Sequence, residues 1–145
     1  RSEKVTAVRR FPRRYLLRIG RGNLATIAVM EDSLMMQDLL LRLIQSAGHT
    51  VVLWEPLTEA EVAEVAEITA PDLLITDYQM PGIDGLTAVR IAREVIPRLP
   101  VIVLTAIRDK EVHEAFQLAG VDRILLKPLP VAAIREAIES VLGKP

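Results

Sequence analysis

Residues 75–85 read Ile75-Thr76-Asp77-Tyr78-Gln79-Met80-Pro81-Gly82-Ile83-Asp84-Gly85, and this stretch decides the fold. It begins inside an apolar, strand-like run, which ends at the carboxylate of Asp77. A turn through Pro81 and Gly82 follows, and a helical pattern starts at Asp84. A strand, a turn and a helix in this order are typical of one β–α unit of an α/β protein.

Strand-like runs recur along the chain from Ala25 onward. They are short and almost continuously apolar, as expected for parallel strands that are buried on both faces. The five runs are Thr26–Met30, Thr50–Trp54, Leu73–Thr76, Val101–Leu104 and Arg123–Leu126.

Helical patterns separate these runs. The first has apolar residues at helical spacing from Met36 to Ala47 and ends at Gly48, and Thr58 opens the second with a capping box. The other three are predicted over residues 84–96, after Asp109 and after Pro130. Five β–α units predict a flavodoxin-like (βα)5 open parallel sheet, with strand order 2-1-3-4-5 and helices on both faces.

Composition excludes several classes of protein. The chain has 145 residues, half of them hydrophobic and only 3 % aromatic, so it can bury one aliphatic core. It has no cysteine, which excludes disulfides and thiolate metal sites, and its two histidines lie in unrelated contexts. No apolar run is long enough to span a bilayer, and no secretory signal is visible, so a cytoplasmic location is expected.

Charge is divided unevenly. Residues 1–24 hold eight of the 18 Lys and Arg and one of the 19 Asp and Glu, a net of +7, whereas residues 25–145 have a net of −8. Because residues 1–24 lack clear periodicity and contain Pro12, we expect a basic N-terminal tail or linker that is disordered, ahead of one domain at residues 25–145. A nucleic-acid or membrane contact through the basic cluster is the less favoured alternative.

Four short stretches carry the chemistry, and each follows or ends a strand-like run. They are Glu31-Asp32, Asp77, Thr105-Ala106 and Lys127-Pro128. The carboxyl ends of strands in a doubly wound sheet open onto one crevice, so three carboxylates, a hydroxyl and an ammonium are expected to meet there. Such a set can hold Mg²⁺ through oxygen ligands and place a phosphoryl group on Asp77. Taken singly, Asp32 and Asp77 could instead be caps of a helix and a turn, and Thr105 an ordinary strand residue.

The segment from Ala25 to Leu142 resembles the receiver domain of bacterial two-component response regulators. The acidic pair, the Asp-x-x-Met-Pro-Gly-x-Asp-Gly run, the Thr-Ala pair and the Lys-Pro pair stand in the order found in that family. The resemblance implies that Asp77 is phosphorylated by a histidine kinase or a histidine phosphotransfer protein.

The resemblance also assigns the other site residues. It implies that Mg²⁺ is bound by Asp32, Asp77 and the backbone carbonyl of Gln79, with Glu31 contributing through water. Thr105 and Lys127 then contact the phosphoryl group, and Thr105 also belongs to the conformational switch.

One position departs from the family. Three residues before the Lys, where the family usually has an aromatic switch residue, this chain has Ile124. Phosphorylation does not need that ring, whereas signalling by its rotation does. In receiver domains the positions of Gln79 and Ile107 influence how long the phosphoryl group stays, and the apolar Ile107 is expected to prolong it.

The first helix is unusually apolar. Beyond its core stripe, Leu34, Met35 and Leu41 are expected to point partly outward and to serve as docking contacts for the phosphodonor. Scattered exposed apolar side chains that carry no function are the alternative.

Three other functions compete. A flavodoxin-type nucleotide binder needs a phosphate loop where this chain has Glu31-Asp32-Ser33. An aspartyl phosphatase of the haloacid dehalogenase type needs a second Asp two residues after the nucleophile, where Gln79 stands, so a turnover enzyme is not expected. A degenerate receiver that serves only as an interaction module is the main rival, and Ile124 is its only support.

Overall fold

The computed structural model describes residues 5–11, 14–19, 24–55 and 58–143. They form a single seven-stranded sheet in the order β1-β2-β4-β3-β5-β6-β7. The strands are β1 Val5–Phe11, β2 Arg14–Ile19, β3 Thr26–Met30, β4 Thr50–Trp54, β5 Leu73–Asp77, β6 Val101–Thr105 and β7 Arg123–Leu126. The helices are α1 Leu34–Ser46, α2 Glu59–Thr69, α3 Gly85–Val95, α4 Lys110–Leu118 and α5 Val131–Leu142.

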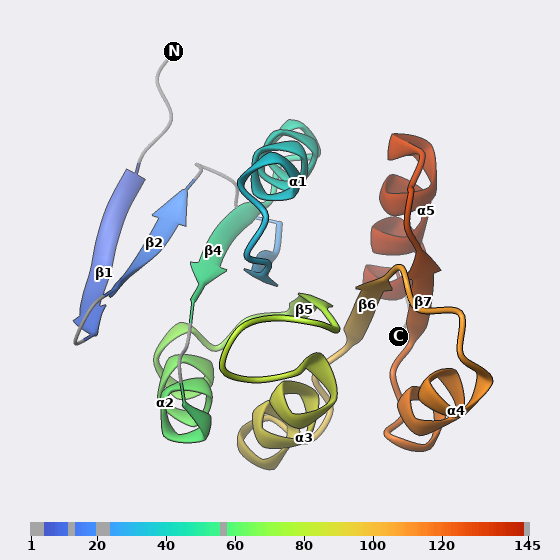
Figure 1. Cartoon of the computed structure of the whole chain (residues 1–145). Helices are drawn as coiled ribbons and strands as arrows, with labels where there is room; N and C mark the ends of the chain where they lie inside the picture. Colours follow the sequence, from blue (N-terminus) through green and yellow to red (C-terminus); the bar gives the residue numbers. More distant parts are fainter. Residues whose placement is uncertain (1–4, 12–13, 20–23, 56–57, 144–145) are drawn as a thin grey trace.

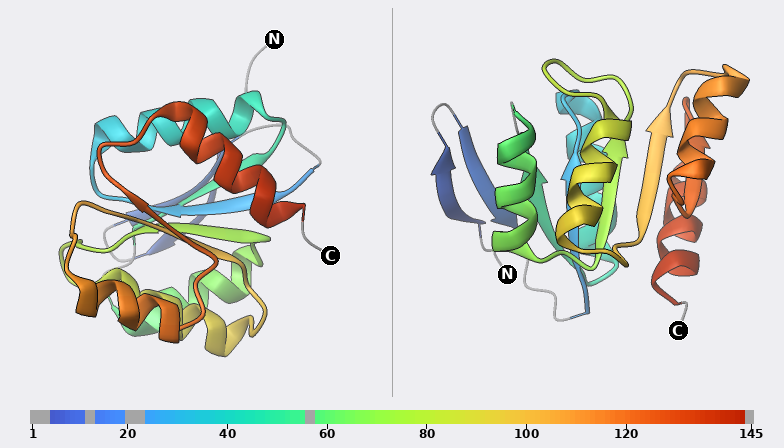
Figure 2. Two further views of the ribbon diagram at one scale, coloured as in Figure 1. Left: turned by 90° about the vertical axis from the view of Figure 1, so that its right-hand side faces the viewer. Right: turned by 90° about the horizontal axis from the view of Figure 1, so that it is seen from below.

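The five strands from β3 onward are parallel to one another and confirm the predicted order 2-1-3-4-5. Figures 1 and 2 show α1 and α5 on one face of the sheet and α2, α3 and α4 on the other. Each face buries its own hydrophobic cluster, because β3, β4, β5 and β6 send alternate side chains to opposite sides. The predicted flavodoxin-like α/β class is therefore confirmed.

The helices begin at the capping residues that the sequence predicts. Thr58 accepts a hydrogen bond from the Glu61 N–H, Asp84 from the Thr87 N–H and Asp109 from the Glu111 N–H. At the other end of α1, Gly48 has φ +90°, a conformation that favours glycine and turns the chain into β4.

The N-terminal segment differs from the sequence prediction. Residues 5–11 and 14–19 form a β-hairpin, so the prediction of a disordered tail is wrong for these residues of β1 and β2. β2 then pairs antiparallel with β4 over residues 17–19. The outer edge of β4 offers free backbone N–H and C=O groups, and a segment that lacks a clear apolar period can pair with them through its backbone alone.

Part of the predicted tail lies outside the described residues, namely 1–4, 12, 13 and 20–23, and the prediction of disorder stays a prediction there. The assignment of residues 25–145 as one domain stays a prediction. Among the described residues, no helix combines the length and the apolar character needed to cross a membrane.

Removing residues 1–23 should leave a folded protein with an uncovered β4 edge. Loss of the backbone pairing to β2 is expected to cost about 2 kcal/mol, at about 1 kcal/mol net per hydrogen bond. This corresponds to a fall of roughly 5–10 °C in the thermal midpoint, with more aggregation. Calorimetry and light scattering measure the two effects. A variant that lacks only residues 1–4 keeps both strands and should match the full chain; an unchanged midpoint after removal of residues 1–23 would contradict a contribution from the hairpin.

Candidate functional site

Chemically active side chains meet at the carboxyl edge of four neighbouring strands. Glu31 and Asp32 follow β3, Asp77 ends β5, Thr105 ends β6 and Lys127 follows β7. The order β3-β5-β6-β7 places these strand ends side by side. All the strand-end residues that the sequence singled out therefore lie along one edge of the sheet.

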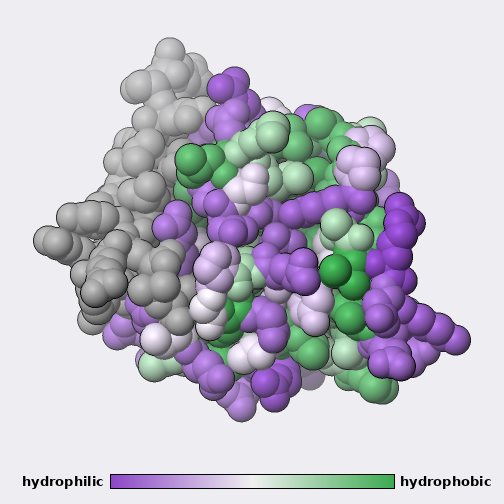
Figure 3. Space-filling model, viewed as in Figure 1, coloured by the Kyte–Doolittle hydropathy of each residue, from purple (hydrophilic) through white to green (hydrophobic). Residues whose placement is uncertain are grey.

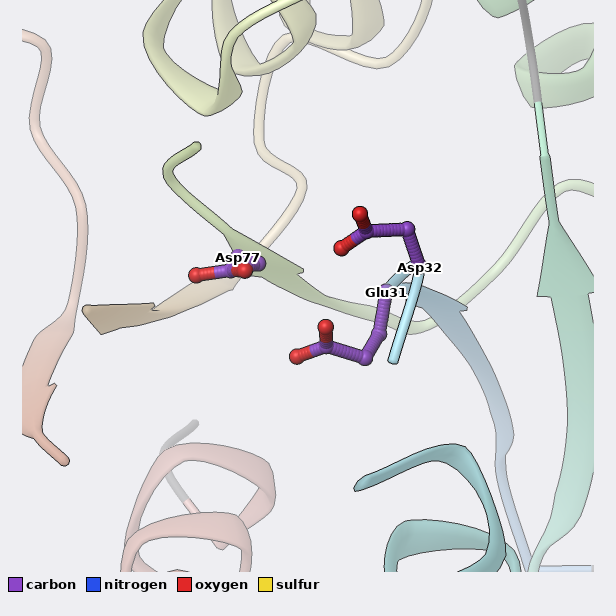
Figure 4. Close-up of side chains that lie close together, drawn as sticks. All are labelled: Glu31, Asp32 and Asp77. Carbon is purple, nitrogen blue, oxygen red and sulfur yellow. The ribbon is translucent and has the colours of Figure 1, made fainter. Parts of the chain in front are cut away.

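Three carboxylates form the acidic part of this edge. One carboxylate oxygen from each of Glu31, Asp32 and Asp77 lies within 4.8 Å of the others. Figure 4 shows the carboxylates of Glu31 and Asp32 directed toward Asp77. Glu31 is 3 % exposed and Asp77 is 9 % exposed, whereas Asp32 is open to solvent. The cluster thus has two buried carboxylates and one accessible carboxylate, beside which a cation can enter.

Lys127 neutralises part of this charge. Its Nζ lies 3.2 Å from Glu31 Oε1 and 3.3 Å from Asp77 Oδ2, so one ammonium joins both buried carboxylates. The Lys127 N–H also donates to the Thr105 carbonyl at 2.8 Å, which extends the pairing of β6 and β7 past the last strand residue. The peptide bond from Lys127 to Pro128 is cis.

Glu31 is fixed by two residues that sequence reasoning missed. The Ser33 N–H donates to Glu31 Oε2 at 3.0 Å, and Gln37 Nε2 donates to the Glu31 carbonyl at 2.5 Å. Burial raises the pKa of Glu31 above its ordinary value of 4.5, and Asp77 adds to the rise, while the Ser33 N–H and Lys127 oppose it. The only hint of these contacts in the sequence was Gln37, a polar residue at a position of α1 that is buried.

Asp77 is held by its own turn. The Tyr78 N–H donates to Asp77 Oδ1 at 2.9 Å, which leaves Oδ2 toward Lys127. Gly85 closes the turn by donating its N–H to the Tyr78 carbonyl at 2.7 Å. A Cβ at Gly85 would lie 2.4 Å from the Asp77 carbonyl oxygen, so the close approach of α3 to β5 requires glycine.

Thr105 lies buried at the end of β6, with 1 % of its surface exposed. Its Oγ1 accepts a hydrogen bond from the Ile107 N–H at 2.9 Å. Ile107 is half-buried beside it, and Gln79, on the loop after β5, is exposed. Ile124 is half-buried on β7 and packs against the hydrophobic cluster that includes side chains of α3 and α4.

A hollow of about 110 Å³ opens beside the acidic cluster. It is bounded by Met30, Glu31, Asp32, Trp54, Glu55, Met80, Pro81 and Ile83. Trp54 is the only tryptophan of the chain, so the tryptophan fluorescence of the protein comes from a residue that lines this hollow.

The donor set fits a hard divalent cation. All the candidate ligand atoms in the cluster are carboxylate oxygens, which Mg²⁺ prefers, and the neighbouring hollow has room for the water ligands that Mg²⁺ usually keeps. A cation and Lys127 together would offset the charge of the three carboxylates and of an incoming phosphoryl group.

Comparison with known proteins agrees with this geometry. Residues 27–139 match the family model described as the response regulator receiver domain.

The chain belongs to the response regulator receiver domain family.

Curated relatives of this receiver domain are response regulators. It is 31 % identical over 120 residues to the transcriptional regulatory protein PdtaR of Mycobacterium tuberculosis, and the match covers 81 % of this chain and 57 % of PdtaR. It is 28 % identical over 120 residues to the polar-differentiation response regulator DivK of Brucella ovis, covering 81 % of this chain and 96 % of DivK. The chain thus spans a little over half of PdtaR and nearly all of DivK.

Solved structures show the same fold. The receiver domain of a sensor histidine kinase from Pseudomonas aeruginosa PAO1, which has a magnesium ion coordinated in its active site cleft, is 27 % identical with a TM-score of 0.72. That match covers 86 % of this chain and all of the other. A CheY-like receiver domain protein from Methanospirillum hungatei JF-1 is 21 % identical with a TM-score of 0.75, covering 83 % of this chain and 95 % of the other.

The pKa of Glu31 should respond in opposite directions to two substitutions. Lys127→Met removes a charge that lowers this pKa and should raise it further, whereas Asp77→Asn removes a charge that raises it and should lower it. Carbon-13 NMR titration of the Glu31 carboxyl without Mg²⁺ measures both shifts, and Lys110→Met, on an exposed lysine of α4, is the matched control.

The raised pKa of Glu31 makes the free energy of unfolding depend on pH. Because the pKa of Glu31 is higher in the folded state, the folded protein binds more protons above pH 4.5, and its stability falls as pH rises from 4.5 through the raised pKa. The fall should be steeper in Lys127→Met. A Glu31 pKa that is the same in both variants would contradict the assigned charge contacts.

Proposed function

We propose that this receiver domain accepts a phosphoryl group from a phosphohistidine onto Asp77, with Mg²⁺ bound at the acidic cluster, as a step of a two-component phosphorelay. The observation that carries the proposal is the position of Lys127 Nζ, 3.2 Å from Glu31 Oε1 and 3.3 Å from Asp77 Oδ2 at the carboxyl edge of the sheet. A lysine so placed offsets the charge of the buried Asp77 carboxylate and can contact an oxygen of a phosphoryl group bound there.

The transfer is a displacement at phosphorus. A carboxylate oxygen of Asp77 forms a bond to phosphorus while the P–N bond to the donor imidazole breaks, and the imidazole nitrogen keeps the bonding pair. The product is an acyl phosphate. Since the Tyr78 N–H already holds Oδ1 and Oδ2 faces Lys127, Oδ2 would be the attacking oxygen.

The surrounding residues would orient the reaction. Asp32, Asp77 and the backbone carbonyl of Gln79 would hold Mg²⁺, with Glu31 acting through water. Mg²⁺ supplies charge neutralisation at the phosphoryl oxygens when it is bound. The hydroxyl of Thr105 would donate to a phosphoryl oxygen, and the receiver would act on its own phosphoryl group without turning over a separate substrate.

The phosphodonor would be a histidine kinase or a histidine phosphotransfer protein. Leu34 and Met35 at the start of α1 are 78 % and 82 % exposed, close in sequence to Asp32, and we propose them as docking contacts. Leu41 is only partly exposed and packs against the core, so it is the weaker candidate. Figure 3 shows apolar side chains over α1, mixed with hydrophilic ones. The cytoplasmic location goes with these partners and stays a prediction.

Phosphorylation of Asp77 can be tested by intact mass after incubation with acetyl phosphate and Mg²⁺. We expect one added phosphoryl group on the wild-type protein, and none in Asp77→Asn, with EDTA present or in Asp32→Ala. Asp38→Asn, on an exposed aspartate of α1, is the matched control and should be labelled fully. Mg²⁺ titration followed by Trp54 fluorescence should show saturable binding that Asp32→Ala weakens.

Two results would count against the proposal. Full labelling of Asp77→Asn would show that another residue is the acceptor. A wild-type protein that neither binds Mg²⁺ nor is labelled would favour an interaction module that does not depend on phosphorylation.

Replacing Ile107 should shorten the lifetime of the acyl phosphate. The half-buried Ile107 follows the buried Thr105 by two residues and cannot orient a water molecule. In Ile107→Glu a carboxylate can do so, and a barrier lower by about 1.4 kcal/mol would speed hydrolysis roughly tenfold. The phosphorylated mass is followed after removal of donor. Arg108→Glu places the same charge one residue further along and should decay like wild type; decay of Ile107→Glu at or below the wild-type rate would rule out this role.

A further inference from the structure

Helix α4 is held to the domain by few contacts. Among its residues Lys110–Leu118, Phe116 alone is buried, and Leu118 at its end is 90 % exposed. In contrast, α3 and α5 bury several side chains each. A helix with so little buried apolar surface can shift at small cost, so α4 is the element on this face that is most easily displaced. Figure 1 shows it at the outer end of its layer, beyond α3.

A hydrogen bond from one residue of α4 connects this helix to the loop that follows β6. His113 Nε2 lies 2.7 Å from the Ile107 carbonyl oxygen. Because a carbonyl oxygen only accepts, the ring nitrogen must carry the proton and donate. The N–H of the same Ile107 donates to Thr105 Oγ1 at 2.9 Å. Two hydrogen bonds on opposite sides of one residue thus join the buried hydroxyl at the site to α4.

Another contact of α4, beside the packing of Val112 on the hydrophobic cluster, leads to the same site. Phe116 packs edge-on against Tyr78, with ring centroids 5.2 Å apart and an interplanar angle of 84°. The Tyr78 N–H donates to Asp77 Oδ1. His113 and Phe116 are three residues apart, so they share one face of the helix. Phe116 can therefore act as a pivot while the turn that carries His113 moves.

Ile124 cannot supply an equivalent link. It is an aliphatic residue without a polar group, half-buried among the side chains that α3 and α4 cover. Its partner in the sheet is Val103, two residues before Thr105, and its side chain cannot form a hydrogen bond with the Thr105 hydroxyl.

We propose that His113 relays the state of Thr105 to α4 through Ile107, in the place of an aromatic switch residue; this rests on the proposed phosphorylation of Asp77. When Thr105 turns its hydroxyl toward a phosphoryl group on Asp77, Oγ1 leaves the Ile107 N–H. The loop at residues 106–109 is then free to move, and the His113 ring carries the first turns of α4 with it. His113 is a positioning residue that touches neither the phosphoryl group nor the carboxylates.

The experiment measures the movement of α4 directly. The chain has no cysteine, so nitroxide labels can be attached at Glu111→Cys in the first turn of α4 and at Glu139→Cys on α5, both exposed. Pulsed electron spin resonance gives the distance between the labels before and after acetyl phosphate and Mg²⁺. Intact mass on the same samples reports the phosphorylated fraction.

Three variants of the labelled protein are compared. His113→Ala should be phosphorylated to the wild-type extent but lose at least half of the distance change. His113→Gln should restore most of it, because an amide Nε2 can still donate to the Ile107 carbonyl. His49→Ala, which removes the other histidine of the chain, is the matched control and should keep the full change.

The outcomes separate the relay from the phosphorylation. A phosphorylated His113→Ala with the full wild-type distance change would overturn the relay alone, as would a fully phosphorylated wild type with no change at all. Loss of phosphorylation in His113→Ala would also overturn the relay, because His113 would then act on the phosphoryl transfer itself. A wild-type protein that is not phosphorylated would overturn the proposed function itself.

Discussion

The site depends on one ammonium placed between two buried carboxylates. Glu31 and Asp77 lie on neighbouring strands at the carboxyl edge of the sheet, where little water reaches them, and Lys127 Nζ contacts both. Buried charges are tolerated only when they are paired and hydrogen-bonded. Lys127, the Ser33 N–H and the Tyr78 N–H meet this need, which leaves exposed Asp32 as the opening for a cation.

Strand order brings these groups together. β3, β5, β6 and β7 end at the same edge, so residues far apart in the chain become neighbours without a long loop between them. The same edge explains why Gly85 is needed: α3 starts so close to Asp77 that a side chain would strike its carbonyl. The rigid sheet thus sets the distances, while the loops after β5 and β6 remain free to respond.

The helices differ in how firmly they are held. α1, α2, α3 and α5 each bury several residues, whereas α4 buries Phe116 alone. Besides packing of Val112 and Phe116 on the hydrophobic cluster, α4 contacts Tyr78 and Ile107, beside the site. Chemistry at a rigid edge and a loosely held helix next to it are the two parts that a conformational signal requires.

The sequence by itself determined the five parallel strands, the helices with their caps, the strand order and the group of residues at the carboxyl edge. Apolar runs, helical spacing and capping residues are local and repeat, so they can be read along the chain. Only the tertiary structure decided that β2 adds to β4, that Ser33 and Gln37 hold Glu31 and that His113 reaches Ile107. An edge strand is chosen by the free backbone groups of its neighbour, and a single hydrogen bond between distant residues leaves no periodic pattern.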